Sequence, residues 1–256
     1  MKFETKCLHA GYRPKNGEPR VQPIVQSTTY TYDSAEEIGK LFDLQAAGYF
    51  YTRLANPTTN APEEKITALE GGVATMCTAS GQSAVFYAML NILEAGDHFI
   101  SSSYVYGGTY NLFAHTFKKM GIEVTFVDQD LPLEELKKAI RPNTKAVFAE
   151  TIANPALRVL DIEKFAALAK AAEAPLLIDN TFATPYLQNP LDMGCDIVLH
   201  SATKYLCGHS DVLMGVLALK DEALAKTMHN MMVNTGGVAG PMDCWLVLRG
   251  IKTLAV

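Results

Sequence analysis

The sequence predicts an α/β protein with a mostly parallel sheet, and three observations lead to this fold class. Short apolar runs alternate with amphipathic segments from residue 62 to about residue 220. Several of these runs are continuously apolar, which is typical of strands covered by helices on both faces. Polar clusters follow four of the runs, where the carboxyl ends of parallel strands form ligand sites. We expect a large α/β domain over residues 51–245.

The composition excludes several broad classes of protein. Of 256 residues, 48% are hydrophobic and 19% are charged, which allows a large core and excludes a disordered chain. The net charge of -5 argues against a nucleic-acid partner. No apolar run approaches the roughly 20 residues that span a bilayer, and the charged first residues do not resemble a signal peptide. We therefore expect a cytoplasmic protein without a membrane partner.

The five cysteines indicate buried thiols rather than a disulfide framework or a metal centre. They are Cys7, Cys77, Cys195, Cys207 and Cys244. Their spacing is wide and contains no CxxC pair, and the six histidines contain no HExxH pattern. The sequence therefore predicts no metal site.

The elements are expected in the following order. Residues 1–50 are rich in polar and turn-forming residues and predict an extended N-terminal arm. A helix should begin at Pro62, because proline and the two glutamates after it suit a first turn, and it should end at Gly71. Asp161 is a plausible N-cap for a later helix. The expected strands are 73–79, 98–103, 122–128, 145–151, 175–181, 196–201 and 212–220. The expected helices between them are 84–96, 108–121, 132–140 and 161–173.

A helix that opens directly after the first strand suggests an anion site. The backbone N–H groups of Gly81 and Gln82 would lie at the N-terminus of that helix, and glycine permits close approach of a phosphate. An ordinary strand–helix turn would have the same sequence. The chain contains neither GxGxxG nor GxxxxGK[ST], so a dinucleotide or a P-loop nucleotide is not favoured.

Two charged residues at other strand ends add to this picture. Asp179 follows an apolar strand, where a carboxylate needs a cation or hydrogen bonds; a protonated pyridine nitrogen or a structural salt bridge would serve. Lys204 could be a solvated surface lysine, or an amine that forms a Schiff base. A phosphate site, an aspartate and a lysine are together the kinds of protein group that bind pyridoxal 5'-phosphate (PLP).

The motifs around these residues resemble a known family. The stretch 196–210, DIVLHSATKYLCGHS, closely resembles the PLP-attachment motif of the Cys/Met metabolism (transsulfuration) enzymes, which include cystathionine γ-synthase, methionine γ-lyase and O-acetylhomoserine sulfhydrylase. The resemblance extends in order over nearly the whole chain. Further matches are YTRLANPT (51–58), ASGQ (79–82), YGGT (106–109), NP (154–155), DNTFATP (179–185) and RGIKT (249–253).

The resemblance implies a fold and a domain organisation. The fold would be PLP fold type I, the aspartate-aminotransferase-like fold, with residues 51–245 as the PLP-binding large domain. Residues 246–256 would begin the connection to a C-terminal domain that full-length members carry and that is absent from this chain. The family's arginine for the substrate carboxylate would lie beyond Val256.

The resemblance also implies the roles of individual residues. Lys204 should hold PLP as a Schiff base and move protons, Asp179 should keep the pyridine nitrogen protonated, and Tyr106 should stack on the ring. These three and Tyr51 form the implied catalytic set. The further implied cofactor-binding residues are Gly81, Gln82, Ser201 and Thr203 at the phosphate, Ser80 beside them, and Asn154 at the ring hydroxyl.

Two of the implied residues act across a subunit interface. In the family, the residues matching Tyr51 and Arg53 reach into the phosphate site of the neighbouring subunit. The resemblance therefore implies a homodimer or homotetramer with shared active sites and a small amino acid as substrate.

The resemblance leaves the reaction open among several members. Residues 69–72, 80–82 and 106–113 look like O-acetylhomoserine sulfhydrylases, which make homocysteine or methionine by γ-replacement on an activated homoserine ester with sulfide or a thiol. Methionine γ-lyases usually carry cysteine where this chain has Gly108. Residues 209–211 and 240–245 look more like cystathionine γ-synthases and lyases. We expect the activity of an O-acetylhomoserine sulfhydrylase. The first alternative is a methionine γ-lyase or a cystathionine γ-synthase/lyase. The second alternative is a truncated, non-catalytic chain that binds PLP.

Overall fold

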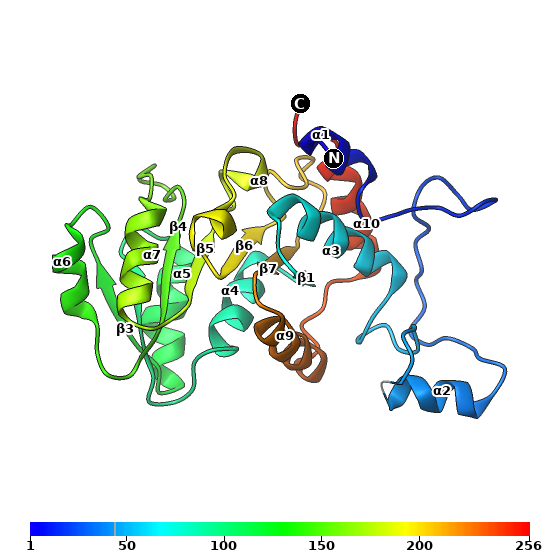
Figure 1. Ribbon diagram of the computed structural model, residues 1–256, viewed down its shortest axis with the longest axis horizontal. Helices are drawn as coiled ribbons and strands as arrows, with labels where there is room; N and C mark the ends of the chain where they lie inside the picture. Colours follow the sequence, from blue (N-terminus) through cyan, green and yellow to red (C-terminus); the bar gives the residue numbers. More distant parts are fainter. Residues whose placement is uncertain (44) are drawn as a thin grey trace.

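A seven-stranded sheet forms the centre of the protein and carries helices on both faces (Figure 1). The computed structural model describes residues 1–43 and 45–256. The strands lie in the order β1-β7-β6-β5-β4-β2-β3. Their bounds are β1 Ala74–Thr78, β2 His98–Ser102, β3 Glu123–Val127, β4 Thr144–Glu150, β5 Leu176–Asp179, β6 Ile197–Ser201 and β7 Gly215–Leu219.

The sheet is mostly parallel, which confirms the predicted fold class. Strands β2, β3, β4, β5 and β6 pair with one another in parallel. Strand β7 is antiparallel to both of its neighbours, β1 and β6. The carboxyl ends of β4, β5 and β6 therefore meet at one edge of the sheet, beside the start of β7.

The helices of this fold vary in length and type. Those with α-helical geometry are α1 Phe3–His9, α2 Ala35–Phe42, α3 Pro57–Glu70, α4 Gly81–Leu90, α5 Gly107–Asn111, α6 Leu133–Leu136, α7 Ile162–Ala171, α8 Thr184–Leu187, α9 Glu222–Thr235 and α10 Pro241–Gly250. A π-helical segment, η1 Leu112–Phe117, continues α5. Three 3₁₀ segments are η2 Lys137–Ala139, η3 Pro190–Met193 and η4 Ile251–Thr253. No helix in the described ranges combines the length and apolar content needed to cross a membrane.

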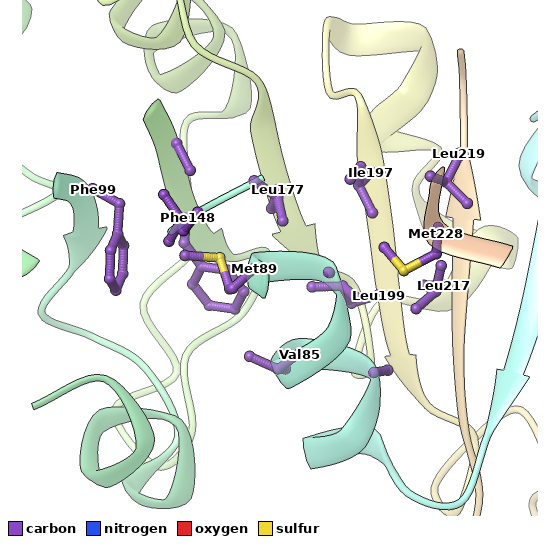
Figure 2. Packing of buried hydrophobic residues seen from close by; sticks show 14 of the residues in the cluster. Val85, Met89, Phe99, Phe148, Leu177, Ile197, Leu199, Leu217, Leu219 and Met228 are labelled. Carbon is purple, nitrogen blue, oxygen red and sulfur yellow. The ribbon is translucent and has the colours of Figure 1, made fainter. Parts of the chain in front are cut away.

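Helices α4 and α9 and the segment η1 cover one face of the sheet. Figure 2 shows Val85 and Met89 of α4 over the sheet side chains Phe148, Leu177 and Leu199. All five side chains are buried, so the hydrophobic effect fixes α4 against the strands. This packing holds the N-terminus of α4 at the edge where β6 ends.

Helices α3, α7 and α10 lie on the opposite face. On α7, Phe165 and Leu168 are buried among the side chains of β4 and β5. Asp161 is its N-cap, as predicted, because its carboxylate accepts a hydrogen bond from the Lys164 N–H at 3.0 Å. Ile66 of α3 and Val247 of α10 belong to a second apolar cluster on this side.

Helix α3 begins earlier than the sequence analysis predicts. Asn56 is its N-cap, with its Oδ1 accepting a hydrogen bond from the Thr58 N–H at 2.8 Å, and Pro57 occupies the first helical position. Pro62, the predicted start, therefore lies inside the helix. The end at Gly71 is confirmed, because this residue has a left-handed φ of 74°.

The N-terminal 50 residues are not wholly extended, because they contain α1 and α2. Helix α1 is fixed to α3 by reciprocal hydrogen bonds. Lys65 Nζ donates to the Cys7 carbonyl at 2.6 Å, and Lys6 Nζ donates to the Ala68 carbonyl at 2.8 Å. After α1 the chain runs out from the sheet toward α2, at the right of Figure 1. The two chain termini lie near each other above α10.

Candidate active site

A cavity of about 270 Å³ opens at the sheet edge formed by the carboxyl ends of β4, β5 and β6. It brings together eight of the predicted residues, namely Ser80, Gly81, Gln82, Tyr106, Asn154, Asp179, Ser201 and Lys204. It is also lined by Glu150, Ile152, Thr181, Phe182 and Leu213, which the sequence analysis does not name. The ends of neighbouring strands therefore bring these eight residues together in one cavity.

The N-terminus of α4 forms one wall of the cavity. Ser80 is its N-cap, because its Oγ accepts a hydrogen bond from the Ser83 N–H at 3.1 Å. The first N–H groups of a helix have no intrahelical acceptor and carry partial positive charge. A Cβ on Gly81 would lie 2.7 Å from the Ser201 Cβ, so glycine allows the end of β6 to approach this wall. This wall therefore suits an anion beside a serine.

Asp179 ends β5 and presents a carboxylate to the cavity. Thr181 donates to Asp179 Oδ1 from both its N–H and its hydroxyl. Burial raises the pKa of Asp179 above its usual range, although these two hydrogen bonds act in the opposite direction. A cation placed against this carboxylate would stabilise its charged form.

Lys204 lies on the connection between β6 and β7. Its Nζ donates a hydrogen bond to Ser201 Oγ at 3.2 Å, and both residues line the cavity. Thr203, by contrast, is not among the lining residues. Its hydroxyl accepts a hydrogen bond from the Met214 N–H at 3.1 Å and so ties the two ends of this connection together. Its predicted contact with a phosphate stays a prediction.

Tyr106 precedes α5 and is 49% exposed at the cavity. Its ring rests close to the backbone of the first turn, because a Cβ on Gly108 would lie 2.5 Å from Tyr106 Cε1. Its backbone N–H donates to Glu150 Oε1 at 2.7 Å. Backbone and ring are therefore held by different neighbours.

Glu150 is the functional candidate that the sequence analysis missed. It ends β4 in register with Asp179 on β5 and is 5% exposed. Burial, and then the charge of Asp179, raise the pKa of Glu150 to about 8. Its local signal was an acid closing an otherwise apolar strand, four residues before Asn154.

Tyr51 and Arg53 do not line the cavity of their own chain. The Arg53 guanidinium lies over the Tyr51 ring, 5.3 Å from its centroid, and donates to the Val233 carbonyl on α9. The structure therefore keeps these two predicted residues together but away from Lys204.

Comparisons of the sequence with known proteins identify its family. Residues 4–256 match the model of the family described as Cys/Met metabolism PLP-dependent enzyme. L-methionine gamma-lyase of Fusobacterium nucleatum subsp. polymorphum is 44% identical over 98% of this chain and 64% of its own length. O-acetyl-L-homoserine sulfhydrylase of Leptospira meyeri is 49% identical over 85% of this chain and 49% of its own length.

The fold agrees as well. The crystal structure of cystathionine gamma-lyase from Lactobacillus plantarum, complexed with L-serine, superposes with a TM-score of 0.92 at 40% identity. The match covers 100% of this chain and 64% of the Lactobacillus plantarum chain. This chain thus spans about two thirds or less of the length of the relatives named here. By sequence, by fold and by the residues that meet in its cavity, it belongs to the Cys/Met metabolism family of PLP-dependent enzymes.

Proposed function

We propose that this chain binds PLP in the cavity and catalyses elimination or replacement on the side chain of an amino acid of sulfur metabolism. One observation carries the proposal. The Lys204 amine, the buried Asp179 carboxylate and the N-terminus of α4 face a single cavity that Tyr106 flanks. Each of the three alone has an ordinary structural explanation, but their convergence does not.

The residues fit the chemical groups of PLP one by one. The helix N-terminus at Gly81 suits a phosphate, and Ser201 stands beside it. Asp179 suits a protonated pyridine nitrogen, because a cation would relieve the cost of its burial. Lys204 supplies the amine that reacts with an aldehyde. When bound, PLP withdraws electrons from an attached amino acid and so eases loss of its Cα proton.

The protein contributes binding, orientation and proton transfer. Lys204 would hold the cofactor between turnovers and then take the proton from the substrate Cα. Asp179 would keep a proton on the ring nitrogen. Tyr106 would cover one face of the ring, and the apolar side chains of Phe182 and Leu213 would exclude water from the same cavity.

Within this chemistry we propose γ-replacement on O-acetylhomoserine with sulfide or a thiol. The sequence motifs named above and the 49% identity to the Leptospira sulfhydrylase support it. Methionine γ-elimination is the second candidate, because the Fusobacterium γ-lyase aligns with 98% of the chain rather than 85%. Cystathionine chemistry is the third, supported by the similarity to the Lactobacillus enzyme.

We also propose that the working enzyme is a homodimer or homotetramer with shared active sites. The placement of Tyr51 and Arg53 outside their own chain's cavity supports this arrangement. A guanidinium suits a phosphate across an interface, because it can donate two hydrogen bonds at once.

The reaction is tested by three parallel assays on the PLP-loaded protein. The substrates are O-acetylhomoserine with sulfide, methionine alone, and O-succinylhomoserine with cysteine. The greatest kcat/KM is expected for the first, and Lys204→Ala, which lacks the amine, is the matched control and should be inactive in all three. A larger kcat/KM for methionine would mean that the enzyme catalyses γ-elimination rather than γ-replacement. A protein that binds PLP through Lys204 but is inactive in every assay would support the non-catalytic alternative.

A further inference from the structure

The Glu150 carboxyl, at the end of β4, holds a segment of the cavity wall that comes from elsewhere in the chain. Its Oε1 accepts a hydrogen bond from the Tyr106 N–H at 2.7 Å. Tyr106 stands at the start of α5. Both residues line the cavity.

We propose that Glu150 is a positioning residue that fixes Tyr106 at the cofactor through its backbone N–H group. This inference rests on the proposed binding of PLP in the cavity. Glu150 sets the backbone from which the Tyr106 ring projects, and Gly108 sets the space into which that ring turns.

An apolar side chain at position 150 would break this arrangement. Glu150 is 5% exposed, so its removal would leave the Tyr106 N–H without its acceptor and with little water to replace it. An unsatisfied buried donor is costly, so the wall would shift until this N–H group found another partner. Tyr106 would then move.

Position 150 requires an acceptor rather than a negative charge. Asp179 lies in register on the neighbouring strand, and together with burial it raises the pKa of Glu150 to about 8. At neutral pH the carboxyl therefore holds a proton and accepts through a neutral oxygen. Glutamine offers the same neutral oxygen at the same position, which makes Glu150→Gln the conservative variant and Glu150→Leu the disruptive one.

Glu63 provides a matched control. Its Oε1 accepts the Cys77 N–H at 2.9 Å, and burial raises its pKa to about 8 as well. It lies on α3 and does not line the cavity. Glu63→Leu therefore removes a comparable acceptor elsewhere in the molecule.

The first measurement is amide hydrogen exchange of the PLP-free chain. Glu150→Leu should speed exchange in peptides covering residues 104–111, Glu150→Gln should leave it as in the wild type, and Glu63→Leu should affect only α3 and β1. If the leucine variant does not fold, Glu150→Asp, which withdraws the acceptor by one methylene, carries the same expectation.

The second measurement is the affinity for PLP at pH 7, with the circular dichroism of bound PLP as a report on its seating. Glu150→Leu should weaken binding about tenfold and Glu150→Gln by less than about threefold, since one buried acceptor is lost in the first and kept in the second.

The outcomes separate this inference from the function on which it rests. Wild-type exchange and affinity in Glu150→Leu, or glutamine behaving as leucine does, would overturn the positioning role and leave PLP binding intact. Faster exchange at residues 104–111 in Glu150→Leu, together with a wild-type chain that binds no PLP, would support the role of Glu150 at Tyr106 and refute the proposed function.

Discussion

Two carboxyl groups meet at the floor of the cavity, and their hydrogen-bond donors give them different tasks. Asp179 accepts hydrogen bonds from the N–H and the hydroxyl of Thr181, two positions along the same segment, and it lines the cavity. Glu150 instead accepts from another loop through Tyr106. Under the proposed function, the first carboxyl would face the ligand and the second would support the wall.

Asp179→Asn separates the charge of this residue from its shape. Because burial disfavours the carboxylate, the amide should leave the thermal midpoint unchanged or slightly higher. Turnover should fall by about a thousandfold or more, because the preorganised charge opposite the ring nitrogen is lost. The thermal midpoint is measured on the PLP-free chain and turnover on the PLP-loaded protein. Turnover near the wild-type value would mean that another group partners the ring.

Gly108→Ala tests the seat of the Tyr106 ring. The new Cβ would lie 2.5 Å from Tyr106 Cε1, so the ring must turn, and PLP affinity should decrease. Gly107→Ala is the control, because a Cβ there meets nothing within 4 Å. Alanine favours a helix over glycine by up to about 1 kcal/mol at either position, so stability alone cannot explain a difference. Equal affinities in the two variants would show that the ring does not depend on the glycine.

Among individual residues, the sequence predicts those that belong to a recognisable local motif. Lys204 and Asp179 each stand in a recognisable stretch after a strand, and both reach the cavity. Glu150 could not be found in the same way, because its role depends on the register of β4 with β5 and on a loop from elsewhere in the chain. Thr203 belongs to the predicted motif, yet its hydroxyl contacts the Met214 backbone.

Helices and strands were also predicted well where local sequence determines them, and less well where it does not. Each predicted strand end lies within three residues of the observed end, because each strand contains a run of apolar residues. The start of α3 was missed because its cap, Asn56, lies in a segment without a hydrophobic pattern. The predicted helix 108–121 changes to π geometry at Leu112, and nothing in the periodicity marks that change. Helices α9 and α10 lie beyond the last element that was predicted.

The contact between α3 and β1 should make stability depend on pH. The pKa of Glu63 is about 8 in the folded protein and about 4.5 when the chain is unfolded. Between these values the folded state binds more protons, so the free energy of unfolding should fall as pH rises from about 4.5 to 8. Glu63→Gln cannot ionise and should lose this part of the decline.

This pH dependence is measured by denaturant unfolding at several pH values between 4.5 and 8.5. Glu64→Gln is the control, because its side chain is exposed on the same helix. Curves for Glu63→Gln that run parallel to the wild type would show that Glu63 keeps its charge in the folded protein.

The order of the strands in the sheet is a property of the whole molecule rather than of any single element. The sequence predicted a parallel sheet but not its strand order, which places β7 between β1 and β6 in the opposite direction. That order depends on contacts between distant segments. It brings the chain before Gly215 back to the edge where β6 ends.

Shared active sites predict complementation between two variants that are defective in different ways. Arg53→Ala should weaken PLP retention, and Lys204→Ala should abolish turnover. In a mixed dimer, one site would combine the intact Arg53 of one subunit with the intact Lys204 of the other. Random exchange at equal amounts should therefore restore about a quarter of the wild-type activity, since half of the dimers are mixed and each has one complete site. Activity is assayed after mass spectrometry shows mixed dimers. Mixed dimers that stay inactive would place both residues in the site of one chain.

The reversal of β7 also determines how far the Lys204 amine can move. The connection 202–214 leaves the sheet at Ser201 and returns at Gly215, its direct partner across the ladder, and the Thr203 backbone N–H donates to the Met214 carbonyl. Such a short tether gives the amine a high effective concentration at the cavity. With PLP bound as proposed, this amine would stay beside the cofactor after product leaves, so the bond between them would re-form as an intramolecular reaction. The antiparallel strand would thus act as a kinetic safeguard against loss of the cofactor.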